Sequence, residues 1–110
     1  MIGILGGTFD PVHEGHFHIA NQVLIRLGLE QVQFVPCALP VHRDDPHASA
    51  SDRCAMIDLM IANQAAFVLN TLELDRGGPS FMVDSLREIR ENTGSTLVLV
   101  LGADAFNDFA

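Results

Sequence analysis

Residues 6–16 have the sequence GGTFDPVHEGH and separate two segments of different hydrophobic pattern. Before them, residues 2–5 are mostly apolar, which predicts a strand. After them, apolar residues recur at helical spacing over residues 17–27, and Gly28 stands where a helix favours a left-handed C-cap. Residues 6–16 are therefore predicted to connect a strand to a helix, at the carboxyl end of the strand.

The rest of the chain repeats this alternation of strand-like and helix-like segments. Residues 36–51 carry three prolines and no hydrophobic periodicity, so they are predicted to form a long exposed loop. The alternation predicts an α/β fold with a mostly parallel sheet in a single domain, residues 1–110. Further strands are expected at residues 32–35, 67–74 and 96–101, and further helices from a cap at Ser51 or Asp52 to about residue 63 and over residues 80–92.

Charge and cysteine content restrict the function. Six arginines, no lysine and fourteen acidic residues give a net charge of −8, which argues against nucleic acid or an anionic membrane as a partner of a basic surface. Cys37 and Cys54 form no CxxC pair and are expected to be reduced. The N-terminus has no basic leader and no membrane-spanning length of apolar sequence. We therefore expect a cytoplasmic protein.

The fourth apolar run, residues 96–102, has the sequence TLVLVLG and is apolar on both alternating faces. Such a strand is expected to be covered by helices on both sides. Only eight residues follow it, too few for another helix and parallel strand, so the sequence looks cut short. The fourth strand is then expected to form an exposed edge, through which the chain could associate with itself.

The loop at residues 6–16 contains the residues best suited to chemistry. It matches neither GxGxxG nor a Walker A motif, but Gly6 and Gly7 would let backbone N–H groups approach a phosphate near a helix N-terminus. His13 and His16, three residues apart, could donate hydrogen bonds to phosphoryl oxygens. The alternatives are a plain strand-to-helix turn and a small zinc-binding interaction module. His18 is expected to be structural.

These residues also carry a family resemblance. GGTFDPVHEGH resembles the nucleotide-binding motif of the nucleotidylyltransferases that share an (H/T)xGH sequence, and the whole chain resembles the N-terminal part of bacterial nicotinate-nucleotide adenylyltransferases. Three later segments are similar to that family: PVHR at residues 40–43, GPSFMVDSL at 78–86 and GAD at 102–104. Pantetheine-phosphate adenylyltransferases, the alternative within the superfamily, usually have Thr where this chain has His13.

The resemblance implies a Rossmann-like parallel sheet of order 3-2-1-4 in three α/β/α layers, without the C-terminal part of the family fold. It implies adenylyl transfer from ATP, with Mg²⁺, to nicotinate mononucleotide. The alternative is a fragment that binds nucleotide without turnover, because the family's aromatic nicotinate-stacking residue and its later phosphate motif are absent here. The implied residues are His13 and His16 as catalytic groups, Gly6, Gly7, Thr8, Phe9, His42, Arg43, Gly102 and Asp104 for ATP and its phosphates, and Ser80, Phe81 and Met82 for nicotinate mononucleotide, with no protein ligand to the metal.

Overall fold

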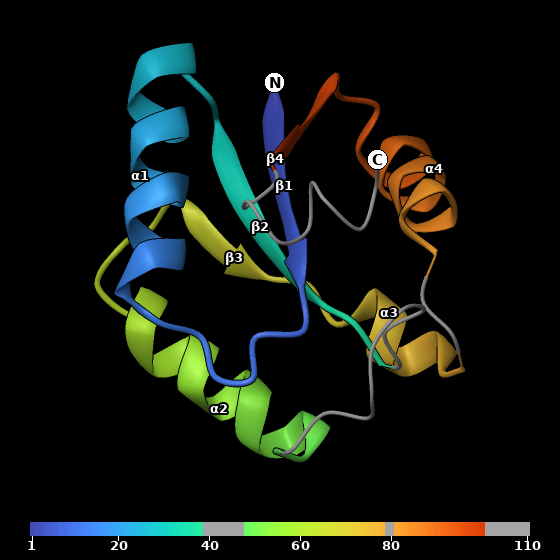
Figure 1. The fold of residues 1–110 in the computed structure, drawn as a ribbon. Helices are drawn as coiled ribbons and strands as arrows, with labels where there is room; N and C mark the ends of the chain where they lie inside the picture. Colours follow the sequence, from blue (N-terminus) through green and yellow to red (C-terminus); the bar gives the residue numbers. More distant parts are fainter. Residues whose placement is uncertain (39–47, 79–80, 101–110) are drawn as a thin grey trace.

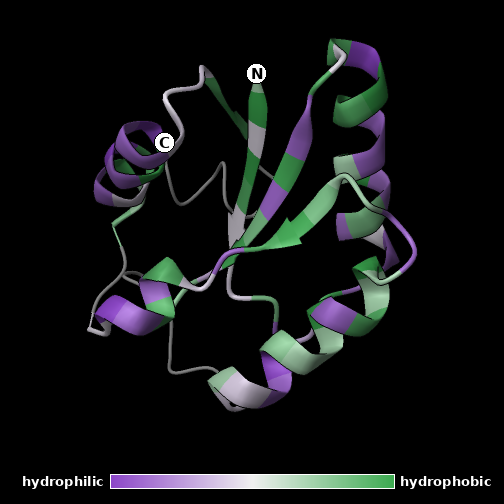
Figure 2. Ribbon diagram, turned by 180° about the vertical axis from the view of Figure 1, so that it is seen from behind, coloured by the Kyte–Doolittle hydropathy of each residue, from purple (hydrophilic) through white to green (hydrophobic). Residues whose placement is uncertain are grey.

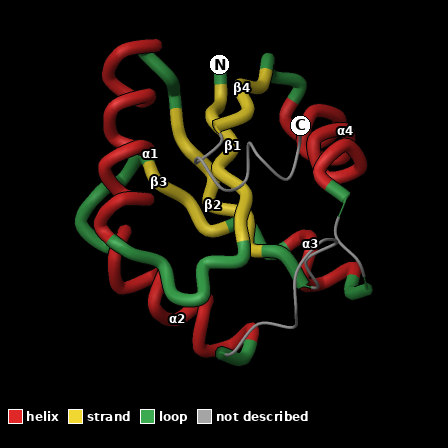
Figure 3. The backbone as a smooth tube through the Cα atoms, viewed as in Figure 1, coloured by secondary structure: helices red, strands yellow, loops and turns green. Residues whose placement is uncertain are grey.

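The structure, a computed structural model, describes residues 1–38, 48–78 and 81–100. Strands and helices alternate along these residues, except that two helices precede the last strand (Figures 1 and 3). In chain order the elements are β1 (Ile2–Gly7), α1 (Glu14–Leu27), β2 (Gln31–Pro36), α2 (Ala50–Ile61), β3 (Phe67–Leu69), α3 (Leu72–Arg76), α4 (Met82–Thr93) and β4 (Leu97–Val100).

The four strands form one parallel sheet in the order β3-β2-β1-β4, which confirms the expected order. β1 pairs with β2 on one side and with β4 on the other, so it lies in the interior of the sheet. The chain runs outward from β1 to β2 and β3, and then returns to β4 on the opposite side of β1. The carboxyl end of β1 is therefore at the topological switch point, where open α/β sheets bind ligands.

Helices cover both faces of the sheet. On one face, Leu5, Phe34 and Val100 pack with residues of α1 and α2, including Ala20 and Ile57. On the other face, a second cluster joins alternate strand residues to α3 and α4; it contains Ile2, Ile4, Val35, Leu72, Met82, Leu86, Ile89 and Leu97. Figure 2 shows β3 and β4 as largely hydrophobic and α4 as largely hydrophilic. The alternation of strand side chains between two covered faces confirms the three-layer arrangement.

The expected third strand, residues 67–74, is wrong beyond Leu69. The Asn70 backbone N–H still donates to the Phe34 carbonyl at 2.9 Å, but the Asn70 side-chain carbonyl accepts from the Leu72 N–H at 3.0 Å. This local turn by an asparagine competes with strand pairing, and the short helix α3 begins at Leu72.

Helix ends follow the expected residues in part. Gly28 and Gly94 adopt the left-handed conformation as the C-caps of α1 and α4, with φ of 60° and 66°. The expected cap of α2 at Ser51 or Asp52 is wrong, because the Ser49 hydroxyl accepts from the Asp52 N–H and the helix begins at Ala50. None of the described helices is long and apolar enough to cross a membrane.

Candidate functional site

The turn after β1 is held to the end of β2. The N–H of Cys37 donates to the carbonyl of Gly7 at 2.9 Å, one residue beyond the last β1–β2 pair, Gly7 and Pro36. A Cβ at Gly7 would meet ring atoms of Phe9 at 3.6 Å or more, which is ordinary contact, so the missing side chain leaves space on this side of the turn. Within the described residues, the backbone N–H groups of Thr8 and Phe9 donate no hydrogen bond. These two donors suit an anionic ligand.

Phe9 has an unusual backbone conformation in this turn. Its φ is 52°, a left-handed conformation that a bulky residue rarely adopts. Its ring is buried with 3% exposure and contacts the imidazole of His16 edge-on, with ring centroids 4.9 Å apart. Backbone strain of this kind persists where the surrounding contacts over-determine it, and it is common at binding sites.

His13 and His16 cap the N-terminus of α1 reciprocally. Nδ1 of His13, the N-cap residue, accepts from the N–H of Gly15 at 3.0 Å. Nδ1 of His16 accepts from the N–H of His13 at 3.0 Å. The two imidazoles lie 3.9 Å apart between centroids. The pair thus forms a capping box in which both side chains are imidazoles.

The capping hydrogen bonds determine the tautomer of both histidines. Because each Nδ1 accepts a hydrogen bond, each neutral imidazole carries its proton on Nε2. Burial lowers the pKa of the half-buried His16 below its ordinary value of 6.5, and the neighbouring His13 lowers it further. His16 is consequently neutral at pH 7, with an Nε2–H that can donate to a ligand oxygen.

Gly15 makes room for the first histidine. A Cβ at Gly15 would lie 2.8 Å from Cε1 and 2.9 Å from Nδ1 of His13. Real Cβ contacts are essentially never this short, so any side chain at residue 15 would displace the imidazole. The absence of a side chain at Gly15 therefore allows the His13 ring to take its observed position.

The start of α4 meets the end of β1. A Cβ at Gly6 would lie 2.1 Å from Cε of Met82, so Gly6 provides the space into which the Met82 side chain extends. Phe81, the N-cap of α4, is half exposed, and its carbonyl accepts from the N–H groups of Asp84 and Ser85. The structure thus brings the predicted nicotinate residues Phe81 and Met82 to the same strand end as the predicted phosphate residues.

Several predicted site residues lie outside the described residues. These are His42, Arg43, Ser80, Gly102 and Asp104. His18, predicted to be structural, is exposed on α1 and lines a shallow surface between α1 and α2. Among the described residues no group of three His, Cys, Asp or Glu side chains could hold a metal ion, so this part of the chain provides no zinc site for His13 and His16.

Two buried polar groups near the site were not predicted. Arg53 of α2 is 2% exposed, and Glu73 of α3 is equally buried beside Ser85 of α4. A signal for the first was present in the sequence: Arg53 occupies the same helical face as the buried Ile57 and Ile61, at spacings of four and eight. Only a polar or charged contact partner can explain an arginine on such a face.

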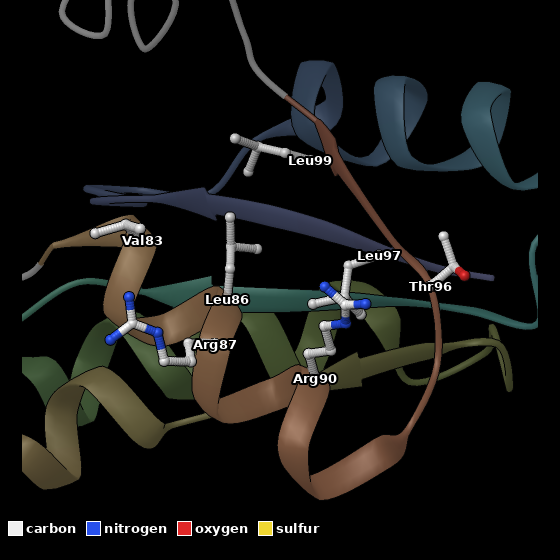
Figure 4. Close-up of a pocket in the computed structure, with 7 residues that line it drawn as sticks. All are labelled: Val83, Leu86, Arg87, Arg90, Thr96, Leu97 and Leu99. Carbon is white, nitrogen blue, oxygen red and sulfur yellow. The ribbon is translucent and has the colours of Figure 1, made fainter.

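A separate groove of about 420 Å³ lies between α4 and β4. Figure 4 shows its lining side chains, with Arg87 and Arg90 extending from α4 and Leu99 from the strand. None of the histidines or turn residues described above contributes to it. Its lining residues are Val83, Leu86, Arg87, Arg90, Thr96, Leu97 and Leu99.

Comparison with known proteins identifies similar sequences. Residues 4–110 match the model of a family described as cytidylyltransferase-like. A protein of Hydrogenovibrio crunogenus named "probable nicotinate-nucleotide adenylyltransferase" is 47% identical over 110 residues, which are 99% of this chain and 53% of that protein. A protein of the same name from Methylococcus capsulatus is 50% identical over 108 residues, 96% of this chain and 51% of that protein. The chain therefore spans about half the length of these relatives.

Solved structures show the same fold. A Plasmodium falciparum nicotinic acid mononucleotide adenylyltransferase complexed with NaAD superposes with a TM-score of 0.80, at 22% identity, over 97% of this chain and 54% of that chain. The structure of the Plasmodium protein complexed with APC has a TM-score of 0.69, at 21% identity, over 97% of this chain and 53% of that chain. At these identities the likeness extends to the fold alone.

Proposed function

The chain belongs to the cytidylyltransferase-like family, and from this premise we propose that it transfers an adenylyl group from ATP to nicotinate mononucleotide. The products are deamido-NAD and pyrophosphate. The relatives in Hydrogenovibrio and Methylococcus bear the name of this activity, and both are about twice as long as this chain. The observation that carries the proposal is the pair of capped imidazoles, His13 and His16, beside the turn after β1.

The reaction needs positioned charge rather than a protein nucleophile. A 5′-phosphate oxygen of nicotinate mononucleotide attacks the α-phosphorus of ATP in line, and the bond to the β-phosphate bridging oxygen breaks as pyrophosphate leaves. Negative charge on the transferring group is then stabilised by donors that are already in place. We assign this role to the Nε2–H groups of His13 and His16 and to the backbone N–H groups of Thr8 and Phe9.

The capping box prepares the two imidazoles for this task. Because their Nδ1 atoms are hydrogen-bonded to backbone N–H groups, the rings need no reorientation when a phosphate arrives. The N-terminus of α1 adds the positive end of a 14-residue helix dipole. Gly7 adds no side chain that would keep a phosphate away from the backbone, whereas the space beside Gly6 is occupied by the Met82 side chain.

A divalent ion belongs to this proposal as part of the nucleotide substrate. The described residues contain no cluster of carboxylates that could hold it, whereas Mg²⁺ is commonly bound through substrate phosphates and water. We propose that Mg²⁺ enters with the ATP triphosphate and neutralises part of its charge. All the residues assigned to ATP stay predictions, and of these His42, Arg43, Gly102 and Asp104 lie outside the described residues.

The second substrate is assigned to the start of α4. Phe81 and Met82 lie at the N-terminal turn of this helix, where backbone N–H groups favour an anion such as the nicotinate carboxylate. The contact between Met82 and Gly6 places this turn beside the proposed phosphate site. Ser80 remains part of this assignment as a prediction.

A pyrophosphate-release assay tests the activity. The chain is incubated with ATP–Mg²⁺ and, in separate reactions, nicotinate mononucleotide, nicotinamide mononucleotide or 4′-phosphopantetheine, and the nucleotide product is identified by mass. Release with nicotinate mononucleotide alone is expected. Release only with phosphopantetheine would replace the proposed substrate, and ATP binding without release from any acceptor would leave a nucleotide-binding fragment. Metal analysis of the purified protein tests the zinc module.

Self-association is proposed separately. Among the described residues, β4 pairs only with β1, and Leu97, Val98 and Leu99 are half-buried. Unpaired strand edges with apolar side chains recruit partners. Light scattering over a range of concentrations is expected to show a mass that rises above 11.9 kDa, whereas a dilution-insensitive monomer would contradict this.

A further inference from the structure

Arg53 is buried at a position where a positive charge is energetically unfavourable. Its residue exposure is 2%, and no described carboxylate pairs with it. It also stands near the N-terminus of α2, four residues after the cap Ser49, where the helix dipole disfavours positive charge. A guanidinium remains protonated inside a protein, so the cost is not avoided by loss of a proton. Such a residue is poorly explained by stability alone.

The hydrogen bonds of Arg53 converge on the candidate phosphate site. One terminal nitrogen, Nη1, donates to the carbonyl of Thr8 at 2.9 Å and to the carbonyl of Cys37 at 2.8 Å. Nε of Arg53 has no partner among the described residues. In Figure 1 the connection between β1 and α1 passes beside α2, in agreement with these contacts. The guanidinium of Arg53 on α2 therefore links the residue that follows β1 to the residue that follows β2.

The contacts of the Thr8 and Gly7 carbonyls determine where the backbone N–H groups that follow them point. In a trans peptide the C=O and N–H point in opposite directions, and the only cis peptide among the described residues is Asp10-Pro11. Because the Thr8 carbonyl points to Arg53, the N–H of Phe9 points away from α2. In the same way, the Gly7 carbonyl points to the N–H of Cys37, and the N–H of Thr8 points away from β2. The direction of each N–H is thus determined by the hydrogen bond that the carbonyl of the same peptide group accepts.

We propose that Arg53 is a positioning residue for the phosphate site, which holds the Thr8 and Cys37 carbonyls and so aims the Phe9 N–H at a nucleotide phosphate. This role rests on the proposed function, because it presumes that the turn after β1 binds the triphosphate. The fixed positive charge behind the turn further favours an anion in front of it. The unusual φ of Phe9 fits this role, since the Thr8 contact restrains the adjoining peptide.

The first measurement is made without nucleotide. Amide NMR spectra of the wild type are compared with those of Arg53→Met, which keeps the side-chain length but removes the donors, and Arg53→Lys, which keeps the charge. The Phe9 and Ala38 amide resonances are expected to move in Arg53→Met, while those of β3 stay in place. Arg26→Gln, an exposed arginine near the end of α1, is the matched control and should leave the turn unchanged.

The second measurement is titration with ATP–Mg²⁺ by calorimetry. Arg53→Met is expected to bind about tenfold more weakly or worse, because a charged hydrogen bond to the turn is lost, and Arg53→Lys should recover part of that affinity. In Arg53→Met the Phe9 amide should no longer respond to nucleotide, while the His16 amide still does. A purely structural role would weaken both responses together.

The outcomes separate the two proposals. Absence of ATP–Mg²⁺ binding in the wild type would overturn the proposed function, and the nucleotide-free spectra would then decide whether Arg53 positions the turn. A folded Arg53→Met protein with wild-type affinity and unmoved Phe9 resonance would overturn the positioning role. If Arg53→Met does not fold, the test is made with Arg53→Lys. Wild-type affinity and spectra in Arg53→Lys would overturn the positioning role, because they would show that the two-carbonyl contact of a guanidinium is not required.

Discussion

The imidazole of His13 lies against the backbone of Gly15, and the Gly15 N–H donates to its Nδ1 at 3.0 Å. The glycine is required by this contact, because a Cβ would lie 2.8 Å from the ring. Gly15 thus determines the position of the His13 ring by having no side chain, and its N–H determines the tautomer of His13 and completes the helix cap. The HEGH sequence is consequently a single structural unit, because the N–H of His13 in turn donates to Nδ1 of His16.

Substitution Gly15→Ala is expected to move the His13 ring and weaken the cap of α1. Loss of an N-cap hydrogen bond costs about 1 kcal/mol and the higher helix propensity of Ala offsets part of this cost, so the free energy of unfolding in urea should fall by less than this amount. ATP–Mg²⁺ affinity should fall together with it. The control is His13→Ala: if Gly15 acts through His13, adding Gly15→Ala to that variant should cause little further loss of affinity, and full additivity would contradict the relationship.

Substitution His16→Ala is expected to lower kcat for pyrophosphate release much more than it raises KM. In the proposed mechanism the Nε2–H of His16 interacts most strongly as charge develops on the transferring phosphate, and loss of one such donor typically costs about 3 kcal/mol, roughly a hundredfold. His18→Ala, an exposed histidine on the same helix, should leave both constants unchanged. A change in KM with constant kcat would make His16 a ground-state ligand.

The stability of the protein should depend on pH through His16. The pKa of His16 is lowered in the folded state by burial and by His13, whereas an unfolded histidine titrates near 6.5. As pH falls below about 6.5, the unfolded chain therefore binds a proton before the folded chain does, and stability falls until the folded pKa is passed. Above that window this contribution is constant.

Urea unfolding at pH 7.5 and 5.5 measures this dependence. Glutamine at the third position of a helix can complete a capping box without titrating in this range, so His16→Gln is the matched variant. The loss of stability between the two pH values should be smaller in His16→Gln than in the wild type. An equal loss in both proteins would show that other groups cause it.

Gly6 and Met82 should be energetically coupled. The added Cβ of Gly6→Ala would collide with Cε of Met82, the flexible end of that side chain, so we expect a cost at the low end of the range for overpacking, about 1 kcal/mol. Met82→Ala removes the colliding atoms, so the double variant should lose less stability than the sum of the single variants, by more than about 0.5 kcal/mol. Urea unfolding of all four proteins gives the coupling, and additive losses would place Met82 elsewhere.

Substitution Ser85→Ala should destabilise the packing of α4 against α3. The Ser85 hydroxyl donates to Oε2 of the buried Glu73 at 2.5 Å and accepts from Nη2 of Arg76 at 2.8 Å. Leaving buried groups without partners costs about 1–3 kcal/mol, and more where a charge is involved. Ser51→Ala, on the exposed side of α2, is the control.

A second substitution identifies the cause of that loss. In the Ser85→Ala background, Glu73→Gln should recover part of the stability, because a neutral amide is less costly to bury than a carboxylate. Thermal unfolding of the single and double variants measures this. No recovery would show that the loss comes from the contacts of the hydroxyl with Arg76 and the Phe81 carbonyl rather than from Glu73.

The sequence by itself determined the class of fold and the location of the candidate site. Apolar runs and helical spacing report local geometry, so the positions of the four strands, the helices α1, α2 and α4 and the two glycine C-caps were predictable from neighbouring residues. The family resemblance supplied the strand order, which the structure confirms. The boundary at Asn70 was missed because a side-chain hydrogen bond to Leu72 competes there with an otherwise favourable strand pattern.

Only the tertiary structure decided how the site is held. Arg53 is 45 residues from Thr8 and 16 from Cys37 in sequence, and Ser85 is 12 from Glu73, so no local pattern pairs them. The orientation of His13 and His16 likewise depends on which nitrogen the backbone engages, a choice that spacing alone leaves open. Periodicity predicts which face of an element is buried, whereas the partner of a buried polar group depends on which distant segments the fold brings together.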